Sequence, residues 1–176
     1  MSVIKNVDPG PGADALVVEP GEGRAVSLGG LGVVFKIMGE RTAGAFSIVE
    51  HSVAPGTLAP AHVHEREDEL SYVIEGELGV RIGDEERVVP AGAYVGKPRG
   101  VPHAFWNKSE GPARLIELIA PAGFERYFAE LAELFADGAP PPERIAALRE
   151  RYGLRAVDWN EDLERRHGVR MRRARP

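Results

Sequence analysis

The most informative segment of the sequence runs from Gly56 to Gly76 and reads GTLAPAHVHEREDELSYVIEG. His62 and His64 lie two residues apart on a predicted strand, so their side chains point to one face and their imidazoles can converge on one ion. Glu69 follows His64 at an odd offset, which would place it on the opposite face of a continuous strand. We therefore expect the EREDE segment to turn and a new strand to begin near Glu69, with its carboxylate facing the histidines.

A second stretch, Gly92 to Asn107, reads GAYVGKPRGVPHAFWN and places His103 at the start of another predicted strand. Three neutral imidazoles and one carboxylate would suit a divalent transition metal ion (Fe, Mn, Ni, Co, Cu or Zn) and leave open positions on a six-coordinate ion. The chain has no cysteine, so a metal site has to be built from His, Asp and Glu. An HxH pair alone more often marks two exposed or hydrogen-bonded histidines, and the spacing of the glycines decides between the two interpretations.

The fixed positions are Gly56, His62, His64, Glu69 and Gly76 in the first stretch and, after fifteen residues, Gly92, Pro98, Gly100, His103 and Asn107 in the second. This spacing resembles the two paired motifs of the cupin superfamily at every fixed position, including the short interval of its single-domain members, the monocupins. The resemblance implies an all-β fold, a double-stranded β-helix or jelly-roll barrel. It also implies that His62, His64, Glu69 and His103 ligate a divalent metal ion, while Pro98 and Asn107 are structural positions.

The rest of the chain agrees with this fold class. Glycine and proline supply 21 and 14 of the 176 residues, and between positions 30 and 121 they cut the chain into short segments rich in β-branched and aromatic residues. We expect an N-terminal arm or early edge strand at 1–29, the cupin β-barrel at 30–121, a C-terminal α-helical extension at 122–164 and a basic tail at 165–176.

The helical extension is predicted from a change of period. Apolar residues from Phe124 to Phe135 recur at helical spacing and form one stripe, which Gly138 and Pro140 end. A second helix is predicted across Glu143 to Tyr152. The apolar stripe needs a partner, which is either the outside of the β-barrel or a second copy of the chain.

Charge is unevenly distributed along the chain. The net charge is −5, but residues 165–176 hold six arginines and no acid, which leaves 16 basic against 27 acidic residues elsewhere, or −11. The acidic body argues against nucleic-acid binding by the whole protein. The basic tail is either a solvated terminus or a contact for nucleic acid, an anionic membrane or a neighbouring subunit.

The N-terminal residues lack the apolar core of a signal peptide, and no run approaches the roughly 20 apolar residues that span a bilayer. We therefore expect a cytoplasmic protein with no membrane insertion. We also expect a homodimer, because cupin barrels often pair and the chain has an arm and an apolar stripe available.

Strand alternation predicts the residues of a substrate pocket. Ser71 and Val73 share the face of Glu69, and Phe105 shares the face of His103. The pairs Phe46 with Ile48 and Phe35 with Ile37 are candidates either for the cavity or for the opposite core layer. Three further predictions concern side chains away from the ion: Tyr72 and Trp106 pack between layers or at a dimer contact, His51 lies at the surface or behind the ligands, and Glu65, Glu67 and Asp68 face solvent.

The single barrel followed by PAGFERYFAELAEL (121–134) resembles the bacterial cupin proteins described as quercetin 2,3-dioxygenase-like. That resemblance implies a metal-dependent dioxygenase for a small aromatic, flavonol-like or dicarbonyl substrate, with Glu69 as both ligand and catalytic base. Two alternatives use the same scaffold. One is a metal-dependent isomerase, epimerase or lyase, and the other is a non-catalytic module that binds a small ligand or a metal.

Overall fold

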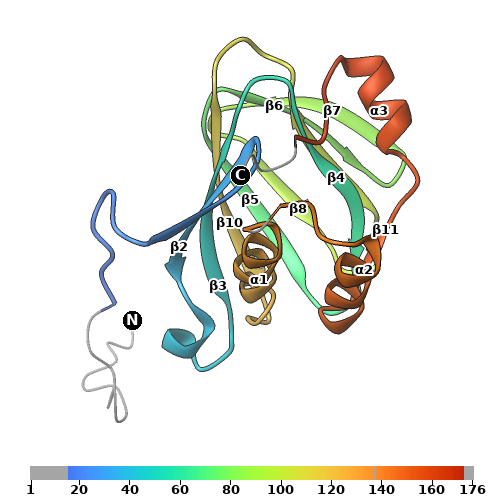
Figure 1. Cartoon of the computed structure of the whole chain (residues 1–176). Helices are drawn as coiled ribbons and strands as arrows, with labels where there is room; N and C mark the ends of the chain where they lie inside the picture. The colour runs from blue at the N-terminus through green and yellow to red at the C-terminus, as the bar shows by residue number, and fades with distance from the viewer. Residues whose placement is uncertain (1–15, 137, 173–176) are drawn as a thin grey trace.

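The computed structural model describes residues 16–136 and 138–172. In this part of the chain, two antiparallel sheets face each other and form a jelly roll (Figure 1). The six-stranded sheet has the order β1 (Arg24–Leu28), β2 (Leu31–Ile37), β3 (Ser47–Val53), β10 (Ala113–Ala120), β5 (Asp68–Glu75) and β8 (Tyr94–Lys97). The five-stranded sheet has the order β11 (Leu154–Ala156), β4 (Thr57–His64), β9 (His103–Asn107), β6 (Glu77–Ile82) and β7 (Glu85–Pro90). The all-β jelly-roll prediction is confirmed.

Alternation along the strands places the core between the two sheets. In β10, for example, every second residue is buried, and Leu115 joins Val73 and Phe105 in one apolar cluster. Glycines make room where backbones or rings approach closely. A Cβ on Gly79 would lie 2.1 Å from the Trp106 indole, and Gly76 has a φ of 73° with the Pro112 carbonyl 2.8 Å from the position of a Cβ. A side chain at either position would disrupt the packing or the turn.

A short 3-10 helix, η1 (Gly39–Thr42), links β2 to β3, and the helices α1 (Glu125–Phe135), α2 (Pro142–Arg151) and α3 (Asn160–His167) follow the last barrel strand. The apolar stripe of α1 packs onto the barrel, where Phe124 and Tyr127 join Phe35 and Leu154 in a second core cluster. The two predicted helices are therefore confirmed, and the stripe is covered by the chain's own β-barrel. None of the helices in residues 16–136 and 138–172 is long and apolar enough to cross a membrane.

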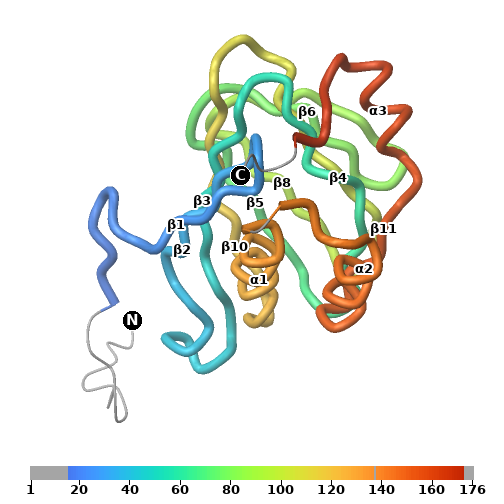
Figure 2. Tube along the Cα trace, in the orientation of Figure 1, coloured from blue at the N-terminus to red at the C-terminus, as the bar shows by residue number. Residues whose placement is uncertain are grey.

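The C-terminal segment differs from the expected tail. Helix α3 runs across position 165, where we expected the basic tail to begin, and lies beside β4 and β7 (Figures 1 and 2). Leu163 and Val169 are buried against Trp106, and Leu58 donates its N–H to the Arg170 carbonyl. The start of the basic segment is therefore packed on the barrel, while residues 173–176 lie outside the described residues.

The structure describes only part of the segment 1–29, for which we expected an N-terminal arm or an early edge strand. The edge-strand alternative is found at β1, which pairs with β2. Positions 1–15 lie outside the described residues.

Candidate metal centre

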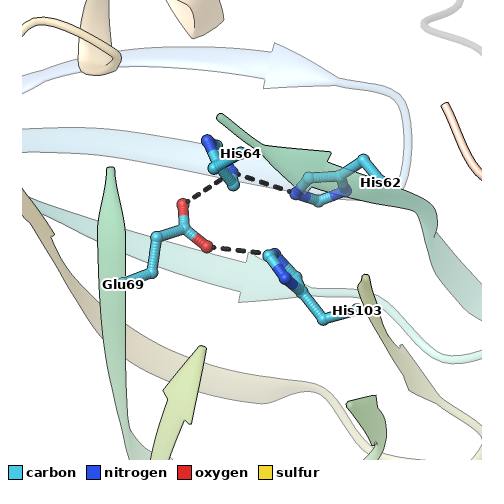
Figure 3. Close-up of side chains that lie close together, drawn as sticks. All are labelled: His62, His64, Glu69 and His103. Carbon is cyan, nitrogen blue, oxygen red and sulfur yellow. Dashed lines mark hydrogen bonds and ion pairs between the residues drawn. The ribbon is translucent and has the colours of Figure 1, made fainter. Parts of the chain in front are cut away.

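Four side chains from three strands converge at one end of the barrel (Figure 3). His62 and His64 project from the same face of β4, and His103 on β9 lies directly opposite His62 in the strand register. Glu69 begins the inward face of β5, after the turn that the EREDE segment was predicted to make. One donor atom of each residue lies within 4.8 Å of the others. The structure thus brings together all four residues that the sequence singled out.

Backbone carbonyls orient two of the imidazoles. His62 Nδ1 lies 2.6 Å from the Pro60 carbonyl, and His103 Nδ1 lies 3.1 Å from the Val101 carbonyl. A carbonyl only accepts, so each Nδ1 has to carry the proton and each Nε2 keeps its lone pair for the cluster. His64 Nδ1 faces the Glu67 carboxylate at 3.4 Å, which favours the same tautomer.

The protonation of the cluster follows from its charges. Burial, together with the neighbouring His103 and His64, holds the pKa of His62 well below its usual range. Burial lowers the pKa of His64 as well, but the Glu69 and Glu67 carboxylates outweigh it and raise that pKa to about 9. Burial would raise the pKa of Glu69, yet Lys97 and His64 hold it well below its usual range. The carboxylate is therefore ionised, and a proton on His64 balances it.

The residues present fit a divalent transition metal ion. His62 Nε2 and His64 Nε2 face each other at 3.1 Å, and once an ion displaces the proton of His64 both nitrogens present lone pairs to the same point. His103 Nε2 is buried without a hydrogen-bond partner among the described residues. Such atoms are costly to bury unless something binds them. Three imidazole nitrogens and a carboxylate oxygen form a donor set that a divalent cation satisfies.

A chain of buried charges extends from the cluster into the barrel. Lys97 on β8 lies 2.9 Å from Glu69 Oε2 and also pairs with Glu117 on β10. Lys97 and both glutamates are at most 5% exposed. Glu117 further accepts a hydrogen bond of 2.7 Å from the Ser71 hydroxyl and lies 3.5 Å from His51. Lys97, Glu69 and Glu117 each have an opposite charge beside them, which offsets the cost of removing these charges from water.

The cluster lies on the wall of a cavity of about 380 Å³. His62 and Glu69 line this cavity together with His51 and Glu117, and apolar side chains of α1, α2 and the β1–β2 hairpin form most of the remaining wall. Its aromatic residues are Phe105, Phe124, Tyr127, Phe128 and Phe135. A mostly apolar cavity with a few convergent polar groups is the usual form of a small-molecule site.

Only one of the predicted pocket residues Ser71, Val73, Phe105, Phe46 and Ile48 lines the large cavity. Phe105 lines the cavity, whereas Ser71 and Val73 line a separate void of about 10 Å³ next to Lys97. Phe46 and Ile48 are absent from the cavity wall because the inward face of β3 carries Ser47, Val49 and His51 instead. Both faces of this strand mix apolar and polar residues, so alternation of apolar residues did not identify the inner one.

Three other predictions are settled by burial. His51 is 1% exposed, so its predicted surface position is wrong, and its ring lines the cavity beside Glu117. Asp68 pairs with Arg99 at the surface, which leaves Glu69 as the acid that faces the histidines. The prediction that Glu67 faces solvent is wrong, because its carboxylate is buried against His64.

Comparison with known proteins finds several that are similar to part of this chain. Residues 49–119 match the model of the Cupin domain. Germin-like protein 1-1 of Oryza sativa subsp. japonica is 32% identical over 117 residues, which cover 64% of this chain and 54% of that protein. The chain thus spans about half the length of this curated relative.

Two solved structures are also similar. The polyketide cyclase RemF from Streptomyces resistomycificus is 28% identical with a TM-score of 0.52, over 59% of this chain and 78% of that one. An RmlC-like cupin from Shewanella frigidimarina has a TM-score of 0.54 at 22% identity, over 62% and 93%. The domain match and the shared fold show that residues 49–119 of this chain resemble a cupin domain.

Proposed function

We propose that the protein is a metal-dependent, dioxygenase-like enzyme that acts on a small aromatic, flavonol-like or dicarbonyl molecule. The observation that carries the proposal is the position of His62 and Glu69 on the wall of a cavity of about 380 Å³ with five aromatic side chains. A flat, largely apolar ligand would contact these rings, while a carbonyl or enol oxygen reaches the donor cluster.

His62, His64, Glu69 and His103 would hold the ion, with backbone carbonyls and Glu67 fixing the imidazoles. A divalent ion held there would supply Lewis acidity to the enol or carbonyl oxygen of the substrate and, if redox-active, electrons for oxygen chemistry. The chain's own contribution is to orient the ring system between β9 and α1 and to exclude water from it.

The test is oxygen uptake by protein loaded anaerobically with Fe(II), Mn(II), Co(II), Ni(II), Cu(II) or Zn(II). The substrates are flavonols and 1,2- and 1,3-diketones, and the matched control is His103→Ala, which lacks one donor. Uptake that needs both a redox-active metal and His103 would support the proposal. Absence of uptake across these metals and substrates would reject it.

A second candidate is a metal-dependent reaction without oxygen, in the isomerase, epimerase or lyase class. The similarity to the polyketide cyclase RemF favours it, because closing a ring on a polyketide needs carbonyl polarisation and proton transfer but no oxidant. Turnover of an enolisable aromatic ketone under anaerobic conditions with Zn(II) would distinguish it from the dioxygenase.

We also propose that the protein forms a homodimer through the outer face of the six-stranded sheet. This face exposes Leu70 and Tyr94, which are 40% and 72% exposed, and the Tyr72 ring packs at a tilt against that of Tyr94, 4.7 Å between centroids. Exposed apolar side chains gathered on one face are typical of interaction surfaces. Elution in size-exclusion chromatography as a 19.1 kDa monomer would contradict the dimer.

A further inference from the structure

A second buried glutamate lines the cavity, and its two carboxylate oxygens are in different situations. Glu117 is 2% exposed and lies opposite Ser71 in the strand register. Its Oε1 accepts hydrogen bonds from Ser71 and Lys97. The contact of Oε2 is with His51 Nε2 at 3.5 Å, which is too long for a strong hydrogen bond. One oxygen is therefore fixed in place, and the other keeps lone pairs for a ligand in the cavity.

Glu69 has no such spare oxygen. Its Oε1 lies 3.2 Å from His64 Nε2, within the donor cluster. Its Oε2 lies 2.9 Å from the Lys97 ammonium and 3.3 Å from His103 Nε2. When one oxygen binds an ion and Lys97 holds the other, Glu69 is poorly placed to take a proton from a substrate as well.

Lys97 also sets the distance between the two carboxylates. Its ammonium contacts both, so the nearest glutamate oxygens are at most about 6 Å apart, the length of two hydrogen bonds. Because Glu69 and Glu117 are neighbours across this one ammonium, a ligand with its carbonyl oxygen at the ion and a hydroxyl group on the neighbouring carbon would place that hydroxyl toward Glu117. The Phe105 ring lies on the same side, 5.6 Å from the Lys97 Nζ, and offers a surface for an aromatic ring.

We propose that Glu117 accepts the hydroxyl proton of an aromatic hydroxy-carbonyl ligand and that Glu69 serves only as a metal ligand. The O–H bond of the ligand breaks, its electron pair stays on the ligand oxygen, and a new O–H bond forms on Glu117 Oε2. The ligand leaves this step as an anion beside Lys97 and the cation. This inference rests on the proposed function for its substrate class, and it moves the base role from Glu69 to Glu117.

The surroundings of Glu117 keep it in the accepting form. Burial and the charge of Glu69 would raise the pKa of Glu117, but Lys97 and His51 outweigh them and hold it below its usual range. Ser71 on β5 faces the same carboxylate, and Phe105 and Phe128 pack against His51. The group is therefore a carboxylate at neutral pH.

The experiment uses 3-hydroxyflavone and, as a matched ligand without the hydroxyl, flavone. Both are titrated without oxygen into zinc-loaded wild type, Glu117→Gln and Glu50→Gln, and absorption spectra separate the neutral flavonol from its anion. Glu50 lies on the neighbouring strand β3 and pairs with Arg114 on the outer face, so E50Q removes a glutamate remote from the cavity.

In wild type and E50Q we expect bound 3-hydroxyflavone to be an anion at a pH where the free compound is neutral. In E117Q the ratio of bound anion to neutral form should fall at least tenfold, with unchanged zinc content and unchanged flavone affinity. An equal ratio in E117Q and wild type, or no binding of 3-hydroxyflavone by wild type, would overturn the proposal.

If E117Q does not fold, Glu117→Asp replaces it, because aspartate keeps the charge beside Lys97 and withdraws the oxygens by about one carbon–carbon bond. The ratio should fall in the same direction, and an unchanged ratio would overturn the proposal. Deprotonation by wild type without turnover under any metal would reject the proposed enzyme activity and still support this role of Glu117.

Discussion

The donor cluster and the helical wall of the cavity are built in contrasting ways. In the cluster, hydrogen bonds and charges fix the side chains: Pro60 and Val101 orient two imidazoles, and Lys97 orients Glu69. In the wall, α1 and α2 contribute apolar contacts, such as Phe124 packed edge-on against His64. Rigid polar placement suits chemistry at one atom, whereas apolar contact tolerates changes of ligand shape. We infer that the cluster determines the reaction and the wall determines which molecule undergoes it.

The largest effect is expected when one imidazole of the donor cluster is removed. His103→Ala should lower zinc affinity at least about 1,000-fold, because a buried donor is lost and its neighbours keep their desolvation cost. Metal per chain after desalting measures this, and saturating zinc should raise the unfolding temperature of wild type but not of H103A. The control is His167→Ala, because His167 lies on α3 and its ring stacks on Trp106 of β9 instead of joining the cluster. A zinc content in H103A equal to that of wild type would mean that the cluster does not bind the ion.

The next effect concerns the carboxylate behind His64. Glu67→Gln should lower zinc affinity about 10- to 100-fold, since partners of metal-bound imidazoles typically contribute that much. Glu65→Gln is the matched control from the same turn, because Glu65 is exposed and pairs with Arg155. Competition with a chromophoric chelator gives both affinities. If the two variants bound zinc equally well, Glu67 would have no role in fixing the imidazole.

The sequence predicted the cluster better than the residues around it, for a physical reason. Side-chain parity and the two spaced motifs identify His62, His64, Glu69 and His103, because a jelly roll has to bring those positions together. Glu117 was missed although a signal existed: it has inward parity between Leu115 and Ile119, on an otherwise apolar face of its strand. A glutamate in such a position needs a buried cation as partner, and Lys97 on β8 supplies it.

The helical part was predictable where apolar residues repeat. The stripe of α1 revealed the helix, but the segment NEDLERRH of α3 has a single aliphatic residue, Leu163, and shows no stripe. Its docking depends on Leu163 and Val169 packing on Trp106, a contact distant in the chain. The inner face of β3 was missed because apolar residues occupy both faces. Long-range packing, rather than local pattern, decided both cases.

A smaller effect is expected from pH. The pKa of His64 is raised to about 9, so between pH 7 and pH 9 an incoming ion has to displace one proton. Raising the pH removes this competitor, so zinc affinity should rise about tenfold per pH unit and level off above pH 9. Calorimetry in buffers of different ionisation enthalpy counts the protons released. An affinity independent of pH in this range would show that His64 is already neutral.

The smallest effect is expected from a substitution in the helical wall of the cavity. Because apolar contacts there do not fix a geometry, a single substitution should change ligand affinity only slightly. Phe128→Leu keeps an apolar side chain but removes a ring that packs edge-on against His51 at 5.2 Å between centroids. Aromatic pairs contribute about 0.5–1.5 kcal/mol beyond their area, so affinity for flavone should fall about 2- to 10-fold, with zinc affinity unchanged. Tyr94→Leu removes an exposed ring on the outer face and should leave flavone binding unaltered. A parallel loss of zinc in F128L would show that the wall and the cluster are one cooperative unit, and the division between reaction and ligand choice would have to be abandoned.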